Sequence, residues 1–247
     1  MRAYHRKRKF RKILGIIVLI CSLFLILVVG FFLLPIFKIK AIEVLGNKEI
    51  KTEEIKDNLN YRNIFLTSEI RIKNDLLKKF PQISELEVKK NLIKREIKIT
   101  IKEREEFGIV CQENSQNCFY IDRKGIIFKE APQTSGSLIV LIKDYSQRDY
   151  GLGERVFEEN TIKFIFETKE FLASEINLKI LDFDILSFPP EDMKALTNED
   201  WYILFNLQKE AEDQLSALKG VLEEKIKDER KNLEYVDLRI ENRVYYK

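Results

Sequence analysis

The sequence predicts an α+β protein with a single N-terminal transmembrane helix, followed by a β-α-α-β-β domain and a mixed β-rich domain with helices. Three observations support this fold class. Residues 13–36 carry no charge, the next part holds short apolar runs in the order strand, helix, helix, strand, strand, and the remainder mixes period-two with helical patterns. The predicted parts are a basic tail (1–12), a transmembrane helix (13–36), a first outer domain (37–105) and a second outer domain (106–247).

The N-terminal residues predict an uncleaved signal anchor that contacts the lipid bilayer through 13–36. Seven cations precede Ile13. At about 1.5 Å per residue, 24 helical residues would cross a hydrocarbon core of roughly 30 Å. A cleaved signal peptide would have a shorter apolar run and a small-residue cleavage site, and a buried core helix would need a polar face. We expect the basic tail in the cytoplasm and the chain from about Lys38 on the other side.

The charge of the outer part argues against a nucleic-acid partner. The whole chain has a formal charge of +3, but without the seven N-terminal cations 36 Lys and Arg face 40 Asp and Glu. The part predicted to lie outside is therefore slightly acidic, and nucleic-acid binding proteins usually carry a basic surface.

The first outer domain shows alternation and helix-boundary residues. Strands are predicted at 39–45, 83–88 and 97–101. Thr52 is expected to cap a short helix, and Ser68 to cap a second one that ends at Pro81. Ile97, Ile99 and Ile101 alternate with polar residues, which predicts a sheet with one buried and one wet face and both helices on the buried face.

The second outer domain mixes strands with two helices. The predicted elements are a hairpin (109–110 and 119–121), strands at 126–128, 138–142, 180–188 and 201–205, helices at 158–172 and 210–226, and closing strands at 233–240 and 243–246. Gly125 is suited to a positive φ in a turn. Asp182 and Asp184 alternate with apolar residues, so we expect them on the wet side of their strand.

Cys111 and Cys118 flank a polar loop between two apolar runs, so a hairpin would bring them together. In an oxidising compartment they could form a disulfide, worth about 2.5 kcal/mol on the loop-entropy model. Two unpaired thiols are the alternative. A metal site is a weak rival because the only histidine, His5, lies in the basic tail. Cys21 lies inside the predicted membrane span.

The sequence offers little for catalysis. The outer part has no histidine, no G-x-S-x-G and no G-x-x-x-x-G-K-[ST], so we predict no catalytic residue, no metal and no cofactor. A membrane-tethered wall hydrolase remains open, because a glycosidase needs only two carboxylates.

Several segments resemble a known family. The segments F-K-I-K-A-I-E-V-L-G-N (37–47), F-P (80–81), L-E-V (86–88) and I-K-I-T-I-K-E-R (97–104) resemble a POTRA domain. The segments C-F-Y-I-D-R-K-G-I-I-F (118–128), Y-V-D-L-R (235–239) and R-V-Y-Y-K (243–247) are similar to the β-domain of the FtsQ/DivIB family of bacterial cell-division proteins. The chain departs from the family where a proline is often present, at 92–95 and after Arg104.

This resemblance implies a single-pass cell-membrane protein, enriched at the division septum, whose C-terminal domains lie outside the cytoplasm. It would be a non-enzymatic divisome scaffold that recruits and regulates septal peptidoglycan synthesis. The alternative is a POTRA-bearing, membrane-anchored chaperone or translocation factor for other polypeptides.

The closing segment 235–246 is predicted to be an open sheet edge, which offers unpaired N–H and C=O groups to a partner strand. Val236 and Leu238 are expected to face the core. The resemblance implies FtsB/FtsL-type coiled-coil partners that bind the closing strands and the exposed, charged side of helix 210–226. The candidate partner-binding residues are Tyr235, Asp237, Arg239, Arg243, Val244, Tyr245 and Tyr246.

Overall fold

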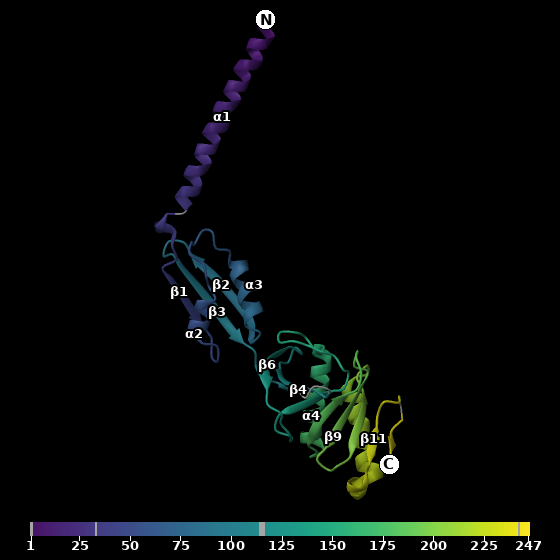
Figure 1. Cartoon of the computed structure of the whole chain (residues 1–247). Coiled ribbons are helices and arrows are strands. Elements are labelled where there is room, and N and C mark those ends of the chain that lie inside the picture. Colours follow the sequence, from purple (N-terminus) through teal and green to yellow (C-terminus); the bar gives the residue numbers. More distant parts are fainter. Residues whose placement is uncertain (1, 33, 114–116, 242) are drawn as a thin grey trace. The chain divides into compact units, whose positions relative to one another are not determined.

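The computed structural model describes residues 2–32, 34–113, 117–241 and 243–247 (Figure 1). An N-terminal apolar helix precedes a three-stranded sheet and a nine-stranded sheet, which confirms the predicted α+β fold class. The chain divides into two compact units, the first ending at Glu103 and the second beginning at Arg104.

Helix α1 spans Arg2–Phe32, and its window Leu14–Phe31 is long and apolar enough to cross a membrane. It ends four residues before the predicted limit at Ile36. Pro35 explains the difference, because proline disfavours a helical residue before it, and the chain forms a short 3₁₀ helix, η1 (Pro35–Phe37), instead. Residues 13–32 alone would still give a helix of about 30 Å.

The first sheet follows the predicted β-α-α-β-β order. Its elements are β1 (Ala41–Leu45), α2 (Thr52–Asp57), α3 (Glu69–Lys79), β2 (Ile83–Asn91) and β3 (Glu96–Glu103). The strand order is β1-β3-β2, with β1 parallel and β2 antiparallel to the central strand. Ile97, Ile99 and Ile101 are buried in a core shared with both helices, as their period-two pattern predicted.

One of the two predicted helix caps of this unit is confirmed. The Ser68 side chain accepts a hydrogen bond from the Arg71 amide at 3.4 Å and begins α3. The expectation for Thr52 is wrong, because Lys51 occupies the cap position of α2 and makes no side-chain cap bond. The Thr52 hydroxyl instead accepts a hydrogen bond from the Asn47 side chain at 3.2 Å.

The second unit is built on the nine-stranded sheet, in the order β12-β11-β10-β9-β8-β7-β4-β5-β6. Its strands are β4 (Gly108–Gln112), β5 (Cys118–Ile121), β6 (Ile127–Ala131), β7 (Val140–Asp144), β8 (Ile180–Ile185), β9 (Asp192–Thr197), β10 (Tyr202–Asn206), β11 (Tyr235–Asp237) and β12 (Tyr245–Tyr246). The helices are α4 (Glu159–Glu175) and α5 (Ala211–Val221), followed by a π-helical turn η2 (Leu222–Ile226) and a 3₁₀ helix η3 (Lys227–Asn232).

Helices α4 and α5 share the main core of this unit with one face of the sheet. Its largest fully buried side chains are Trp201, Phe183 and Phe205. The predicted apolar stripe of the long helix is buried in the same core: Ala211, Leu215, Leu218, Leu222 and Ile226. Val236 and Leu238 also face this core, as expected.

The expectation that Asp182 and Asp184 lie on a wet strand face is wrong, because both are buried. Strand β8 is the central strand of the nine, and its two neighbours place lysines beside these carboxylates. Lys143 Nζ lies 2.7 Å from Asp182 Oδ2, and Lys194 Nζ lies 3.7 Å from Asp184 Oδ2. Burial raises the pKa of the Asp184 carboxyl.

Candidate partner-binding edge

Strand β12 lies at one edge of the nine-stranded sheet and pairs antiparallel with β11. Lys247 exchanges both backbone hydrogen bonds with Tyr235, at 3.2 and 3.3 Å. In an antiparallel ladder the next pair, Val236 and Tyr246, is then of the non-hydrogen-bonded kind. The N–H and C=O groups of Tyr246 therefore point away from β11, and no other strand in the described part of the chain pairs with them.

The side chains on this edge are accessible. Tyr245 and Tyr246 are each 48% exposed, and neighbouring residues of a strand present their side chains on opposite faces. Arg243 donates a hydrogen bond from Nη1 to Tyr245 Oη at 3.4 Å. Val244 packs against the edge of the main core. The edge thus combines free backbone groups with aromatic side chains of a type enriched at interfaces.

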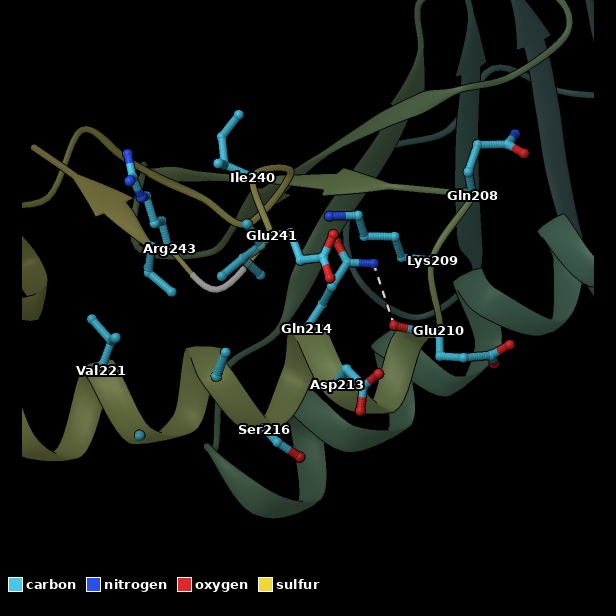
Figure 2. A pocket seen from close by; sticks show the side chains of 14 residues that line it. Gln208, Lys209, Glu210, Asp213, Gln214, Ser216, Val221, Ile240, Glu241 and Arg243 are labelled. Atoms are coloured by element: carbon cyan, nitrogen blue, oxygen red, sulfur yellow. Dashed lines mark hydrogen bonds between the residues drawn. The ribbon is translucent and has the colours of Figure 1, made fainter.

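A groove of about 930 Å³ runs beside this edge, between α5 and the segment that leads into β12 (Figure 2). One wall is formed by Asp213, Ser216, Ala217, Gly220 and Val221 of α5. The other wall is formed by Leu238, Ile240, Glu241, Arg243 and Val244, and the loop before α5 contributes Gln208, Lys209 and Glu210.

The α5 wall is open because its side chains are small. Ser216, Ala217 and Gly220 follow helical spacing, and a Cβ added at Gly220 would meet no atom within 4 Å. The charged side of this helix was the sequence-based candidate, but the groove wall is mostly small or apolar, with Asp213 as its acidic member. The sequence signal that could have revealed this groove wall is the second helical stripe of small residues, which lies beside the buried stripe.

Two side chains hold the groove in shape. The Gln214 amide donates to the Asn206 carbonyl and accepts from the Asn206 amide, both at 2.9 Å, which fastens α5 to the end of β10. Lys209 Nζ donates to the Arg239 carbonyl at 3.3 Å, which joins the loop before α5 to the closing segment. Gln214 is buried, so its two backbone contacts also satisfy its own polar atoms.

Asp237 and Arg239, both predicted to bind a partner, are engaged within the chain. Arg239 donates to both carboxylate oxygens of Asp237, at 2.9 and 2.8 Å, and to Asp192 of β9 at 2.8 Å. The hydrogen bond from Arg239 lowers the pKa of the Asp237 carboxyl. These contacts fasten the closing segment to the sheet.

Tyr235 also has a partner inside the chain, because its ring stacks on Tyr202 with centroids 5.7 Å apart. The remaining four predicted residues, Arg243, Val244, Tyr245 and Tyr246, lie together along the groove and the free edge. The structure adds Gly220, Val221, Ile240 and Glu241, which sequence reasoning missed.

Cys111 and Cys118 face each other across the β4–β5 pair and form a disulfide, one of the alternatives left open by the sequence. It closes the hairpin whose loop residues 114–116 lie outside the described residues. Within the described ranges, no group of three or more His, Cys, Asp or Glu side chains is placed to hold a metal ion.

Comparisons with known proteins agree with this architecture. Residues 37–104 match the family model described as POTRA domain, FtsQ-type. A protein named cell division protein DivIB from Clostridium tetani is 28% identical over 66% of this chain and 60% of its own length. A DivIB protein from Clostridium acetobutylicum is 27% identical over 62% of this chain and 61% of its own length. A DivIB protein from Clostridium botulinum strain Hall is 25% identical over 72% of this chain and 74% of its own length. The match thus spans about three fifths of the first two relatives.

Proposed function

We propose that this chain belongs to the FtsQ/DivIB family and is a membrane-anchored scaffold of the division machinery. The domain match and the DivIB relatives both support this membership. It would act by binding other proteins and would have no catalytic activity of its own. Its partners would be short FtsB/FtsL-type coiled-coil division proteins, through which it recruits and regulates septal peptidoglycan synthesis.

The free edge of β12 carries this proposal. Tyr246 directs one donor and one acceptor away from the sheet, and an extended partner segment can pair with both as an added strand. Main-chain pairing supplies affinity without reading sequence, so specificity must come from side chains. The adjacent groove offers that second contact.

The groove suits an amphipathic partner segment next to the added strand. Val221 and Ile240 offer apolar surface, and the space above Gly220 lets a partner side chain approach α5 closely. Asp213 and Glu241 bring negative charge, while Lys209 and Arg243 bring positive charge. A partner helix with apolar anchors and charges of both signs would match these walls.

Helix α1 supports the membrane anchoring in this proposal. The seven cations before Ile13 favour a cytoplasmic N-terminus, and both outer units would then lie on the other side of the membrane. In this arrangement the binding edge belongs to the extracytoplasmic part of the division machinery.

A depletion experiment in growing cells tests the proposed role. The chain is fused to a fluorescent protein at its N-terminus and supplied under a repressible promoter, with the Tyr246→Pro variant as a second strain. We expect a signal at the division site, filamentation on depletion, and poor rescue by the variant at equal protein levels. Uniform membrane signal together with normal division after depletion would contradict the proposal.

A further inference from the structure

The first unit concentrates its exposed apolar side chains at one end. Outside α1, its large exposed apolar residues in the described part of the chain are Leu34, Ile36, Leu45, Phe65, Leu66, Ile70, Leu92 and Ile93. All except Leu45 come from three segments: 34–37 before β1, 65–70 at the start of α3, and the β2–β3 turn at 92–95. We call the seven residues without Leu45 the apolar pole.

Hydrogen bonds bring these three segments together. Arg95 of the turn donates from Nη1 to the Ile36 carbonyl at 2.8 Å. The Ile64 amide donates to the Phe37 carbonyl at 3.0 Å. Lys90, near the end of β2, donates from Nζ to the Thr67 carbonyl at 2.6 Å. The β2–β3 turn therefore lies at the end of the sheet where the chain arrives from α1 (Figure 1).

Several side chains of the apolar pole are strongly exposed to solvent. Ile93 is 96% exposed, Ile70 is 73% exposed and Leu66 is 66% exposed. Single exposed apolar residues are normal on a protein surface, but a cluster of them marks a site of interaction with another protein or a membrane.

Cations outnumber acids in and next to these segments. Residues 34–40, 62–66 and 92–95 contain no acid and carry Lys38, Lys40, Arg62, Lys94 and Arg95, whereas segment 65–70 holds one acid, Glu69, which accepts a hydrogen bond from the Lys90 amide. Apolar side chains interleaved with cations are typical of surfaces that lie in the headgroup region of an anionic bilayer.

The connection to α1 selects a bilayer as the occupant. Ile36 of the pole is the fourth residue after Phe32, the end of α1. Four extended residues reach at most about 14 Å. When α1 spans a membrane, Ile36 therefore lies within this distance of the end of the membrane helix.

We propose that the apolar pole inserts into the headgroup region of the bilayer that holds α1, so that the POTRA domain rests on the membrane surface. The inference rests on the membrane anchoring in the proposed function. Because α1 already holds the pole near the surface, the effective lipid concentration is high and a few apolar contacts suffice. Docking would give the chain two membrane contacts and restrict the orientation of this domain.

Fluorescence quenching in vesicles tests the proposal with the full chain. An environment-sensitive fluorophore is attached at Ile93→Cys in a Cys21→Ser background, and the protein is reconstituted into phosphatidylglycerol-containing vesicles with a headgroup-region quencher lipid. The matched control carries the fluorophore at Lys78→Cys, an exposed position in the last turn of α3, far from the pole. We expect quenching to be several-fold stronger at position 93 than at position 78.

Two further samples separate the possible failures. A fluorophore on Cys21 of the unaltered chain, in vesicles that carry an acyl-chain quencher lipid instead, reports whether α1 is embedded, because this cysteine lies within the apolar window. Strong quenching at Cys21 with equal, weak quenching at 93 and 78 overturns the pole proposal alone, and no quenching at Cys21 overturns the anchoring as well. In the Leu66→Ser/Ile70→Ser variant, quenching at 93 should fall by at least half, and an unchanged signal also contradicts the proposal.

Discussion

The two edges of the nine-stranded sheet differ in whether another segment of the chain covers them. At the β6 edge, the Ile127 amide donates to the Glu154 carbonyl at 3.0 Å, and the Ile127 carbonyl accepts from the Gly153 amide at 2.7 Å. The segment 153–157 thus covers the start of this edge. At the β12 edge, the backbone groups of Tyr246 point away from the sheet with no described strand beside them. An uncovered edge invites pairing, so the β12 edge is the one that we propose for a partner strand.

The closed edge depends on a tight turn. Gly125 has a φ of +75°, as its place in the turn predicted, and a Cβ there would lie 1.8 Å from the Phe157 carbonyl oxygen. The Gly125 carbonyl accepts the Val156 amide at 2.8 Å, so the covering segment packs directly on this glycine. The difference between the edges therefore originates in the sequence and can be altered by substitution.

The largest effect is expected from opening the closed edge. Gly125→Ala forces a side chain into the Phe157 backbone at a positive φ, and we expect a loss of about 3 kcal/mol in the free energy of unfolding. Denaturant unfolding of the full chain measures it. An unchanged midpoint for Gly125→Ala would show that segment 153–157 is not packed on the turn.

Removing the disulfide should have the next largest effect. It joins β4 and β5, close to the β6 edge in the strand order. The Cys111→Ser/Cys118→Ser variant should lose about 2.5 kcal/mol on the loop-entropy model. Unfolding of the parent chain with and without reductant should show that reduction lowers the free energy of unfolding by the same amount as the double substitution. Partner affinity at the distant β12 edge should not change.

The ion pair between Asp237 and Arg239 at the open edge predicts that the stability of the protein depends on pH. The pKa of Asp237 is lower in the folded state, so its stabilisation is present above the ordinary carboxyl pKa near 3.9 and lost as pH falls through the folded pKa. Asp237→Asn should cost about 1 kcal/mol at pH 7, because the pair is partly exposed.

The deficit of this variant should shrink in acid, which unfolding curves at pH 7 and near pH 3 can measure. The matched control is Glu130→Gln on the exposed face of β6, which should leave stability unchanged at both pH values. A deficit of Asp237→Asn that is the same at both pH values would show that the ion pair does not fasten the closing segment.

The smallest effect on stability is expected in the groove wall. Gly220→Ala adds a Cβ into open space within a helix and should stabilise the protein by about 0.5 to 1 kcal/mol. Gly220→Trp should fold as well but fill the groove and weaken partner binding. Thermal unfolding and a binding titration of both variants measure these effects, and full affinity of the Gly220→Trp variant would remove the groove from the binding site.

Local features of this fold were predictable from the sequence, and long-range pairings were not. The alternation of Ile97, Ile99 and Ile101 marks a sheet with one wet face, so their strand was predicted well. Strand β9 was missed; its alternation of Asp192 and Lys194 with the buried Met193 and Ala195 is short and follows Pro189-Pro190. The parallel pairs β1–β3, β4–β7, β7–β8 and β10–β11 join distant segments, which single-sequence periodicity does not report.

The candidate site was predictable only in part, because several of its contacts join segments that are distant in the sequence. The closing segment was predicted to be an open sheet edge, and β12 does lie at the edge. That Asp237 and Arg239 bind each other depends on the turn after β11 and on Asp192 of β9. The burial of Asp182 and Asp184 depends equally on strand order, since the neighbouring strands β7 and β9 place a lysine beside each.

The most direct test of the open edge is the affinity of the proposed FtsB/FtsL-type partner for two variants of one residue. Tyr246→Ala removes the side chain and keeps the outward N–H, whereas Tyr246→Pro also removes that N–H but leaves the hydrogen bonds to β11 intact. Leu238→Pro would be less informative, because the Leu238 amide bonds to Leu204 inside the sheet at 2.9 Å.

Both variants should unfold at the temperature of the parent chain. The account predicts that Tyr246→Pro binds roughly tenfold more weakly than Tyr246→Ala, because an unpaired acceptor on the partner strand costs about 1 to 3 kcal/mol. Equal affinity of the two folded variants would contradict strand addition at β12.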